Sequence, residues 1–283
     1  MTAQPLSGID HVLIAVDDLD RARMAWTRLG FTLTPRGRHL QQGTGNYCIM
    51  FAQDYIELLG VVDAAQGSGG LDAFLRDGEG LRGLAFATCS GDATAEELRR
   101  RGLHPTPPRD LSRQLELPEG TVLPRFKLVS LPPEETPALS TFVCQHLTPE
   151  LVRRPQWLAH ANGVAGIAGV TVMVAQTEPL REAYERLFGA DVVTTDAVLT
   201  VHVGGHRLVF ATPDDMSALY PEAEIALDRR LPAMAALSLV SRDIGHTADH
   251  LAQWQVMYEE AGDGTLLVPP EEASGALLII AAG

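Results

Sequence analysis

The chain has 283 residues, a formal net charge of −14 and 46% hydrophobic residues. This length suggests about two domains, and the hydrophobic content is that of a globular protein with a sizeable core. The acidic excess argues against nucleic acid or an anionic membrane surface as the main partner, because both are negatively charged. Three scattered cysteines, an N-terminus unlike a signal peptide and the absence of a long apolar run predict a cytoplasmic protein.

Two segments, residues 8–33 and 166–193, share one pattern. Both begin Gly-Ile, continue with alternating apolar residues, and then switch to apolar residues three and four positions apart. Alternation is typical of a strand and the longer spacing of an amphipathic helix. Gly30 and Gly189 follow where a helix would end. The pattern therefore predicts a strand followed by a helix in both copies.

Short strands are expected after each of these helices. Their ranges are 31–35, 47–52 and 55–62 in the first copy, and 198–203 and 206–211 in the second. A weaker repeat relates residues 84–103 to residues 237–256. The chain therefore predicts an α+β fold of four βαβββ units in two pairs, each pair an open, cleft-forming sheet.

The two pairs are expected at residues 1–150 and 164–283, with residues 151–163 as a linker. A short helix capped by Thr148 is expected where the linker begins, because Pro149 suits a first helical turn. His160 and Asn162 are expected to cap the turn that ends the linker.

Several short motifs resemble one known family. They are GIDHV at 8–12, LGF at 29–31, GTGN at 43–46, YIELL at 55–59 and HLTPE at 146–150. Together they resemble the glyoxalase-like domain of the vicinal-oxygen-chelate superfamily, which includes glyoxalases, bleomycin-resistance proteins and extradiol dioxygenases. The resemblance implies paired βαβββ units over the whole chain. It also implies a divalent metal, and a substrate that offers two vicinal oxygens.

The resemblance places metal ligands on the first and last strands of each unit. His11 and Glu57 hold these positions in the first unit, whereas the second has Gly83 on its first strand and Gln145 or His146 on its last. We therefore expect His11, Glu57 and His146 to hold the metal. Imidazole and carboxylate together suit Zn, Fe, Ni or Mn.

Both first-unit residues interrupt apolar strands. An inward carboxylate costs several kcal/mol unless it is paired or bound to a metal. Two simpler alternatives remain open: His11 could only bond Asp10 or a backbone carbonyl, and Glu57 could face solvent in an alternating strand.

Three further residues complete the expected site. Glu57 and His39 are the candidate catalytic groups, and Asn46 and Gln145 the candidate substrate-binding groups. The alternatives are that His39 bonds the backbone of its loop and that Asn46 only shapes a turn.

The second pair of units lacks these residues. Gly169 stands where the first pair has His11, and Leu208 is aligned with Glu57. The other histidines have no convergent partner and are expected on the surface: His104, His202, His206, His246 and His250.

These features predict a metal-dependent lyase, isomerase or oxygenase that acts on a small molecule in the cleft of the first pair. The alternative is a metal-free protein that binds a small molecule, as in drug sequestration. A small molecule is therefore the expected partner, with a monomer and a homodimer both open.

Overall fold

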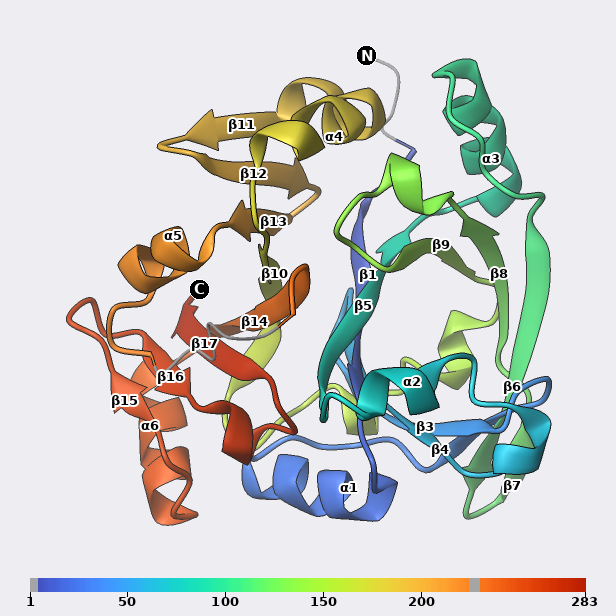
Figure 1. Ribbon diagram of the computed structural model, residues 1–283. Helices are drawn as coiled ribbons and strands as arrows, with labels where there is room; N and C mark the ends of the chain where they lie inside the picture. The colour runs from blue at the N-terminus through green and yellow to red at the C-terminus, as the bar shows by residue number, and fades with distance from the viewer. Residues whose placement is uncertain (1–4, 224–229) are drawn as a thin grey trace.

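The computed structural model describes residues 5–223 and 230–283 and contains two β-sheets with helices around them (Figure 1). The helices are α1 (Leu19–Arg28), α2 (Leu71–Leu75), α3 (Gly91–Arg100), α4 (Arg181–Phe188), α5 (Pro213–Leu219) and α6 (Ile244–Gln253). No helix in these ranges is long and apolar enough to cross a membrane.

The first sheet has nine strands in the order β2-β3-β4-β1-β5-β9-β8-β6-β7, and β2 also pairs with β6. This extra pairing curls the sheet around its concave face. Its strands are β1 (Gly8–Ala15), β2 (Gly37–His39), β3 (Thr44–Met50), β4 (Tyr55–Val61), β5 (Gly80–Ala87), β6 (Arg109–Leu117), β7 (Gly120–Val122), β8 (Arg125–Ser130) and β9 (Thr141–His146). We call this sheet with α1, α2 and α3 the first module.

The second sheet has eight strands in the order β11-β12-β13-β10-β14-β17-β16-β15. They are β10 (Val164–Met173), β11 (Val192–Thr195), β12 (Val198–Val203), β13 (His206–Ala211), β14 (Ala233–Ser241), β15 (Glu259–Glu260), β16 (Leu266–Val268) and β17 (Leu277–Ala282). We call this sheet with α4, α5 and α6 the second module.

The four βαβββ units are confirmed, two in each module. Two local expectations were wrong. Residues 31–35 form no strand, and β2 lies just after them. The helix expected after Thr148 is replaced by two 3-10 turns, Pro149–Leu151 and Pro155–Trp157. Pro155 lacks the N–H that a continuing helix needs. The Thr148 hydroxyl instead accepts a hydrogen bond from the Arg125 N–H.

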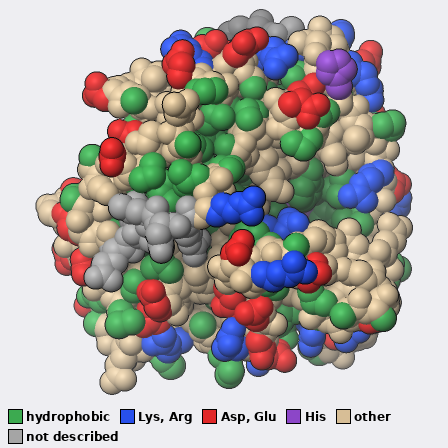
Figure 2. All heavy atoms as spheres, in the orientation of Figure 1, with side chains coloured by type: hydrophobic (Ala, Val, Ile, Leu, Met, Phe, Trp, Pro, Cys, Tyr) green, Lys and Arg blue, Asp and Glu red, His purple; other side chains and the backbone are tan. Residues whose placement is uncertain are grey.

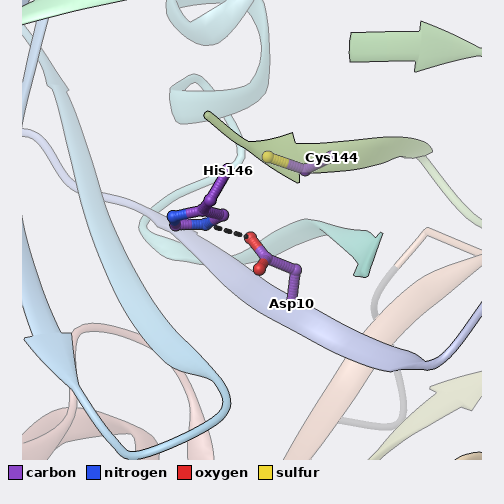
Figure 3. A group of neighbouring side chains, drawn as sticks. All are labelled: Asp10, Cys144 and His146. Atoms are coloured by element: carbon purple, nitrogen blue, oxygen red, sulfur yellow. Dashed lines mark hydrogen bonds and ion pairs between the residues drawn. The ribbon is translucent and has the colours of Figure 1, made fainter. Parts of the chain in front are cut away.

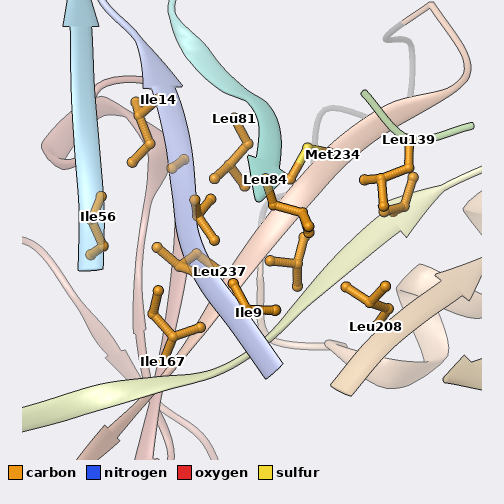
Figure 4. Close-up of a cluster of buried hydrophobic side chains, with 14 of the residues drawn as sticks. Ile9, Ile14, Ile56, Leu81, Leu84, Leu139, Ile167, Leu208, Met234 and Leu237 are labelled. Carbon is orange, nitrogen blue, oxygen red and sulfur yellow. The ribbon is translucent and has the colours of Figure 1, made fainter. Parts of the chain in front are cut away.

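One hydrophobic core joins the two modules. Ile9 and Leu84 from the first sheet and Ile167 and Leu237 from the second belong to the same buried cluster (Figure 4). Each sheet thus turns one face toward a shared core and keeps its concave face for other contacts. In the first module, that concave face carries the polar residues described below.

Candidate functional site

The concave face of the first sheet encloses a cavity of about 260 Å³. Four of the residues predicted for the site line it, and they come from strands β1, β2, β3 and β4. They are His11, His39, Asn46 and Glu57. The structure therefore brings together side chains that lie up to 46 positions apart in the sequence.

A β-bulge in β1 orients the first of these residues. Ile9 pairs with Phe86 on β5 and His11 pairs with Ala85, which leaves Asp10 as an extra residue. A bulge lets neighbouring residues share one face of a sheet. Asp10 and His11 therefore approach each other, while Ile9 stays in the shared core.

His11 is held by one contact at the edge of its ring and one on its face. Its Nδ1 lies 2.7 Å from Oδ2 of Asp10, and its ring stacks on Tyr55 with 4.4 Å between centroids. Burial opposes ionisation of Asp10, but the nearby His146 and His11 outweigh it and hold the pKa of Asp10 well below its usual range. Asp10 is thus an acceptor, so the ring proton of neutral His11 belongs on Nδ1. The other ring nitrogen, Nε2, lies 3.5 Å from Oε2 of Glu57.

Glu57 is a buried carboxylate that the site keeps ionised. Asn46 donates a 2.5 Å hydrogen bond from Nδ2 to Oε1, and His39 Nε2 lies 3.8 Å from the same oxygen. Burial favours the neutral acid, but His11, His39 and Arg113 outweigh it and lower the pKa of Glu57. The inward position of Glu57 rules out the solvent-facing alternative.

His39 is bonded at the start of β3, where Thr44 contacts its ring. Its Nδ1 lies 2.8 Å from the Thr44 hydroxyl, which leaves Nε2 directed toward Glu57. Burial lowers the pKa of His39, and the Glu57 charge only partly opposes this. His39 is therefore a neutral imidazole near neutral pH and can accept a proton.

Arg113 on β6 was not predicted for the site. It is 3% exposed, donates from Nη1 to the Cys48 sulfur at 3.2 Å and lies over the Phe126 ring at 5.7 Å. Burial opposes its charge, but Cys48, Tyr55 and Glu57 raise its pKa. A signal existed in the sequence, because Arg113 occupies an apolar phase of the alternating strand RDLSRQLEL.

His146 and Cys144 form a second group with Asp10 (Figure 3). His146 Nε2 lies 3.1 Å from Asp10 Oδ2, the oxygen that also contacts His11. Burial, and then the Asp10 charge, raise the pKa of the Cys144 thiol well above its usual range. Asp10 therefore lies between His11 and His146 and accepts from both sides.

Two expected site residues do not reach the cavity. His146 contacts Asp10 and does not converge on Glu57, so the predicted trio of His11, Glu57 and His146 is not assembled. Gln145 points to the other face of β9, where its Oε1 accepts a 2.9 Å hydrogen bond from the Gly91 N–H. The alternation along β9 is the reason, because neighbouring residues of a strand face opposite sides.

His11 and Glu57 fit two ligands of one divalent metal. Ligands at 2.0–2.2 Å in a tetrahedral site lie about 3.4 Å apart, close to the observed 3.5 Å. Each ligand also has an outer partner, Asp10 for His11 and Asn46 for Glu57, which is the usual arrangement around metal ligands. His39 could provide a third metal ligand, because its Nε2 lies 3.8 Å from Glu57 Oε1.

In the part of the chain that the structure describes, one trio has donor atoms all within 4.8 Å of one another: Asp10, Cys144 and His146. A metal there would require a thiolate. The raised pKa of Cys144 works against that form. In addition, His11 and Glu57 both line the cavity, whereas Asp10 and His146 do not, so the first pair better fits a metal that a substrate can reach.

The second unit of the first module lacks equivalent ligands. Gly83 pairs with Leu13, and a Cβ at Gly83 would lie 2.5 Å from the backbone oxygen of Ser140. Glu57 on β4 pairs with Leu13, and Phe142 on β9 pairs in the same way with Ala85. Phe142 therefore stands in the second unit where Glu57 stands in the first. The imidazole and carboxylate side chains that could bind a metal in the cavity, His11, His39 and Glu57, therefore all come from the first unit.

The matching face of the second module is apolar and covered. Gly169 follows a bulge in β10 as His11 does in β1, and it pairs with the second residue of β13, Arg207, as His11 pairs with the first residue of β4, Tyr55. Gly169 is therefore the counterpart of His11, as expected. The counterpart of Glu57 is Val209, one residue beyond the expected Leu208, which lies in the shared core.

Helix α5 lies over this face of the second module. Met216 on the helix packs against Met173 and Ala211, and the Tyr220 and Thr171 hydroxyls lie 2.9 Å apart. The space that forms the cavity in the first module is therefore occupied by side chains here.

Comparison with known families identifies the scaffold. The family described as glyoxalase-like domain matches residues 9–188. The chain belongs to this family. Among curated proteins, none matches the chain.

Solved structures of the vicinal-oxygen-chelate fold resemble the whole chain. A hypothetical protein from Staphylococcus aureus is 14% identical, with a TM-score of 0.70 over 97% of this chain and 99% of that one. A mutant of 4-hydroxymandelate synthase from Streptomyces coelicolor is 13% identical, with a TM-score of 0.59 over 99% and 93%. A xylose isomerase-like TIM barrel/4-hydroxyphenylpyruvate dioxygenase fusion protein is 15% identical, with a TM-score of 0.55 over 99% and 49%. At these identities, the likeness establishes the fold.

Proposed function

We propose that the chain is a metal-dependent enzyme that acts on a small molecule with two vicinal oxygens, as a lyase, isomerase or oxygenase. The reaction takes place in the cavity of the first module. We further propose that the modules are two domains, residues 1–150 and 164–283, joined by residues 151–163.

One observation carries this proposal: His11 Nε2 and Glu57 Oε2 face each other at 3.5 Å. With the His11 proton on Nδ1 toward Asp10, both of these atoms are acceptors. Two facing acceptors repel unless a cation, either a metal ion or a second proton, lies between them. A divalent metal supplies that charge and, when bound, acts as a Lewis acid toward substrate oxygens.

The protein groups have separate roles in this proposal. His11 and Glu57 hold the metal, while Asp10 and Asn46 fix the orientation of these two ligands. His39 is neutral and lies beside Glu57, so it can take a proton from the substrate and return it.

The experiment is metal reconstitution. Wild-type protein is stripped with EDTA, incubated with Zn²⁺, Mn²⁺, Fe²⁺ or Ni²⁺, desalted and measured by elemental analysis. We expect one equivalent of metal in the wild type and none in His11→Ala. His202→Ala, which removes an exposed histidine from β12, is the matched control and should bind like wild type. A wild type that retains none of these metals, or a His11→Ala variant that retains a full equivalent, contradicts the proposal.

The second candidate is a metal-free small-molecule binder of the sequestering type. It is favoured by Gly83 and Phe142, which leave the second unit without ligands. In that case His11→Ala and Glu57→Ala would weaken ligand binding although the wild type holds no metal.

A further inference from the structure

The cavity of the first module has a charge opposite to that of the chain. Three arginines line it against one carboxylate, that of Glu57, whereas the whole chain carries −14. They are Arg82, Arg109 and Arg113. Figure 2 shows basic side chains beside the hollow on this face of the molecule. A concave site with excess positive charge attracts anions.

Arg82 differs from the other buried cation of the cavity. Arg113 has Glu57 close enough to raise its pKa, whereas burial alone acts on Arg82 and lowers its pKa. Within residues 5–223 and 230–283, the one hydrogen bond of Arg82 runs from Nη2 to the Gly69 oxygen at 3.1 Å, and its Nε is buried without a partner. A partly buried guanidinium with no acid beside it is costly to maintain.

The fold directs Arg82 into this position by a second bulge. On β5, Gly83 pairs with Leu13 and Leu81 pairs with Ile14, so Arg82 is an extra residue. This bulge places Leu81 in the shared core and Arg82 in the cavity wall.

Arg82 also lies where a ligand of the site could reach it. It lines both this cavity and a second hollow of about 830 Å³ that reaches Met234 of the second module. The bulge puts Arg82 level with the step from Leu13 to Ile14, two to three residues or roughly 7–10 Å along the strands from His11, and one strand across. One small molecule can span that separation.

We infer that Arg82 is a carboxylate-recognition residue, and that the ligand of the first module is a small organic acid. Its carboxylate binds the Arg82 guanidinium while its oxygen-bearing end faces His11 and Glu57. The planar fork of a guanidinium matches the two oxygens of a carboxylate. This inference rests on the proposed function for the position of the oxygen-bearing end, but the carboxylate contact does not require the metal.

The test uses matched acids and amides. The panel contains 3,4-dihydroxybenzoate, 3,4-dihydroxyphenylacetate and 3-(3,4-dihydroxyphenyl)propanoate, each paired with its own primary amide, and affinities are measured by calorimetry with metal-free and metal-loaded protein. We expect the wild type to prefer at least one acid over its amide by ten- to hundredfold, as is typical of a hydrogen bond to a charged group. Arg82→Gln should lose that preference, and Arg82→Lys should keep part of it.

The matched control is Arg76→Gln, which removes the same charge from an exposed position just after α2 and outside both cavities. It should keep the full preference for the acid. Thermal unfolding of Arg82→Gln and Arg82→Lys checks that both variants fold; if Arg82→Gln does not, Arg82→Lys alone decides, because it keeps the charge but loses the fork. The inference is overturned if no acid is preferred over its amide, or if the folded Arg82 variants retain the full preference.

The outcomes separate this inference from the proposed function. If the preference depends on Arg82 while no metal binds at His11 and Glu57, the carboxylate site stands and the metal enzyme falls. If metal binds through His11 and Glu57 while Arg82 has no influence on acid binding, the reverse holds.

Discussion

Strands β1 and β10 match closely on the side that faces the shared core and differ on the concave side. Ile9 and Ile167 occupy equivalent core positions. In both strands the next residue is the extra residue of a bulge, Asp10 in β1 and Ala168 in β10. On the concave side, His11 is replaced by Gly169. The core face therefore preserves the fold in both modules, while the concave face is free to carry polar chemistry or to be filled.

Filling the second module has a physical benefit. An empty apolar hollow would lose packing contacts, and Met216 of α5 supplies them. The first module instead keeps two buried carboxylates that have partners: Asp10 lies beside His11, His146 and Arg153, and Glu57 beside Asn46 and Arg113. Such networks are stable only when most members have partners.

The largest effect is expected when the first module is made to resemble the second. Glu57→Val introduces the residue type that Val209 provides in the second module. Metal affinity, measured by calorimetry with Zn²⁺, should fall by at least about 100-fold, because changes even to outer partners of a metal site cost 10- to 100-fold. Val209→Ala is the control and should leave affinity unchanged. Unchanged affinity in Glu57→Val would show that the carboxylate is only structural.

The reverse change tests why the second module lacks a site. Gly169→His restores the residue type of the first module, but a Cβ there would overlap the backbone oxygen of Arg207. We expect a loss of about 3 kcal/mol in the free energy of unfolding, measured with urea, because a backbone atom must move. Gly205→His, where the added Cβ meets nothing within 4 Å, should have little effect. Equal stability in both variants would mean that β10 can accept a ligand.

The sequence predicted the core face better than the concave face. Alternating apolar residues located β1, β4, β12 and β13, because period-two patterns follow burial directly. The bulge at Asp10 was not predictable, since an extra residue leaves no mark in such a pattern. The contact of His11 with Asp10, left open as an alternative, is present in the structure, but its combination with the bulge and with His146 was not foreseen.

Register was the second limit. Val209, rather than Leu208, is the counterpart of Glu57, and a shift of one residue exchanges the two faces of a strand. For the same reason Gln145 was assigned to the cavity although it faces the opposite side. Both errors come from aligning sequences without strand pairing.

One histidine expected on the surface proves to join the modules. His206 is buried, accepts a 3.1 Å hydrogen bond from the Ile9 N–H at Nδ1 and lies 3.2 Å from Asp54 Oδ2 through Nε2. Asp54 also accepts from the Ile167 N–H at 3.0 Å. A sequence without pairing information gives no sign of these contacts, because His206 lies 152 positions from Asp54 and 197 positions from Ile9.

His206→Ala should therefore weaken the union of the two modules. It leaves the Ile9 N–H without its acceptor and Asp54 without its imidazole partner, so we expect a loss of about 2–3 kcal/mol in urea unfolding. His202→Ala, an exposed histidine on the neighbouring strand β12, should have almost no effect. If both variants lose the same small amount, the contacts of His206 do not help to hold the modules together.

The linker offers the smallest test, because His160 is only one of several linker residues that bond the first module; Arg153 and Asn162 are others. His160 accepts a 3.0 Å hydrogen bond from the Thr32 N–H at Nδ1, and its Nε2 lies 3.1 Å from the Met50 oxygen. The His160 ring thus bonds the first module rather than the turn that it was expected to cap, whereas Asn162 accepts from the Val164 N–H at that turn. Burial lowers the pKa of His160 from 6.5 to about 4, although the bond to Met50 partly opposes this.

A lowered pKa means that the unfolded chain binds the proton more readily than the folded one. Stability from His160 is therefore full above pH 6.5 and is lost as the pH falls from 6.5 toward 4. Between pH 7.5 and pH 5 the loss should be about 2 kcal/mol in the free energy of unfolding. His160→Gln has no titrating ring, so its urea-unfolding curves should lose about 2 kcal/mol less than wild type over the same range. Proton uptake at Nδ1 would set two donors, the protonated ring and the Thr32 N–H, against each other. Identical pH dependence in wild type and His160→Gln would show that the ring stays accessible to protons in the folded protein, and that the linker is held to the first module by its other contacts.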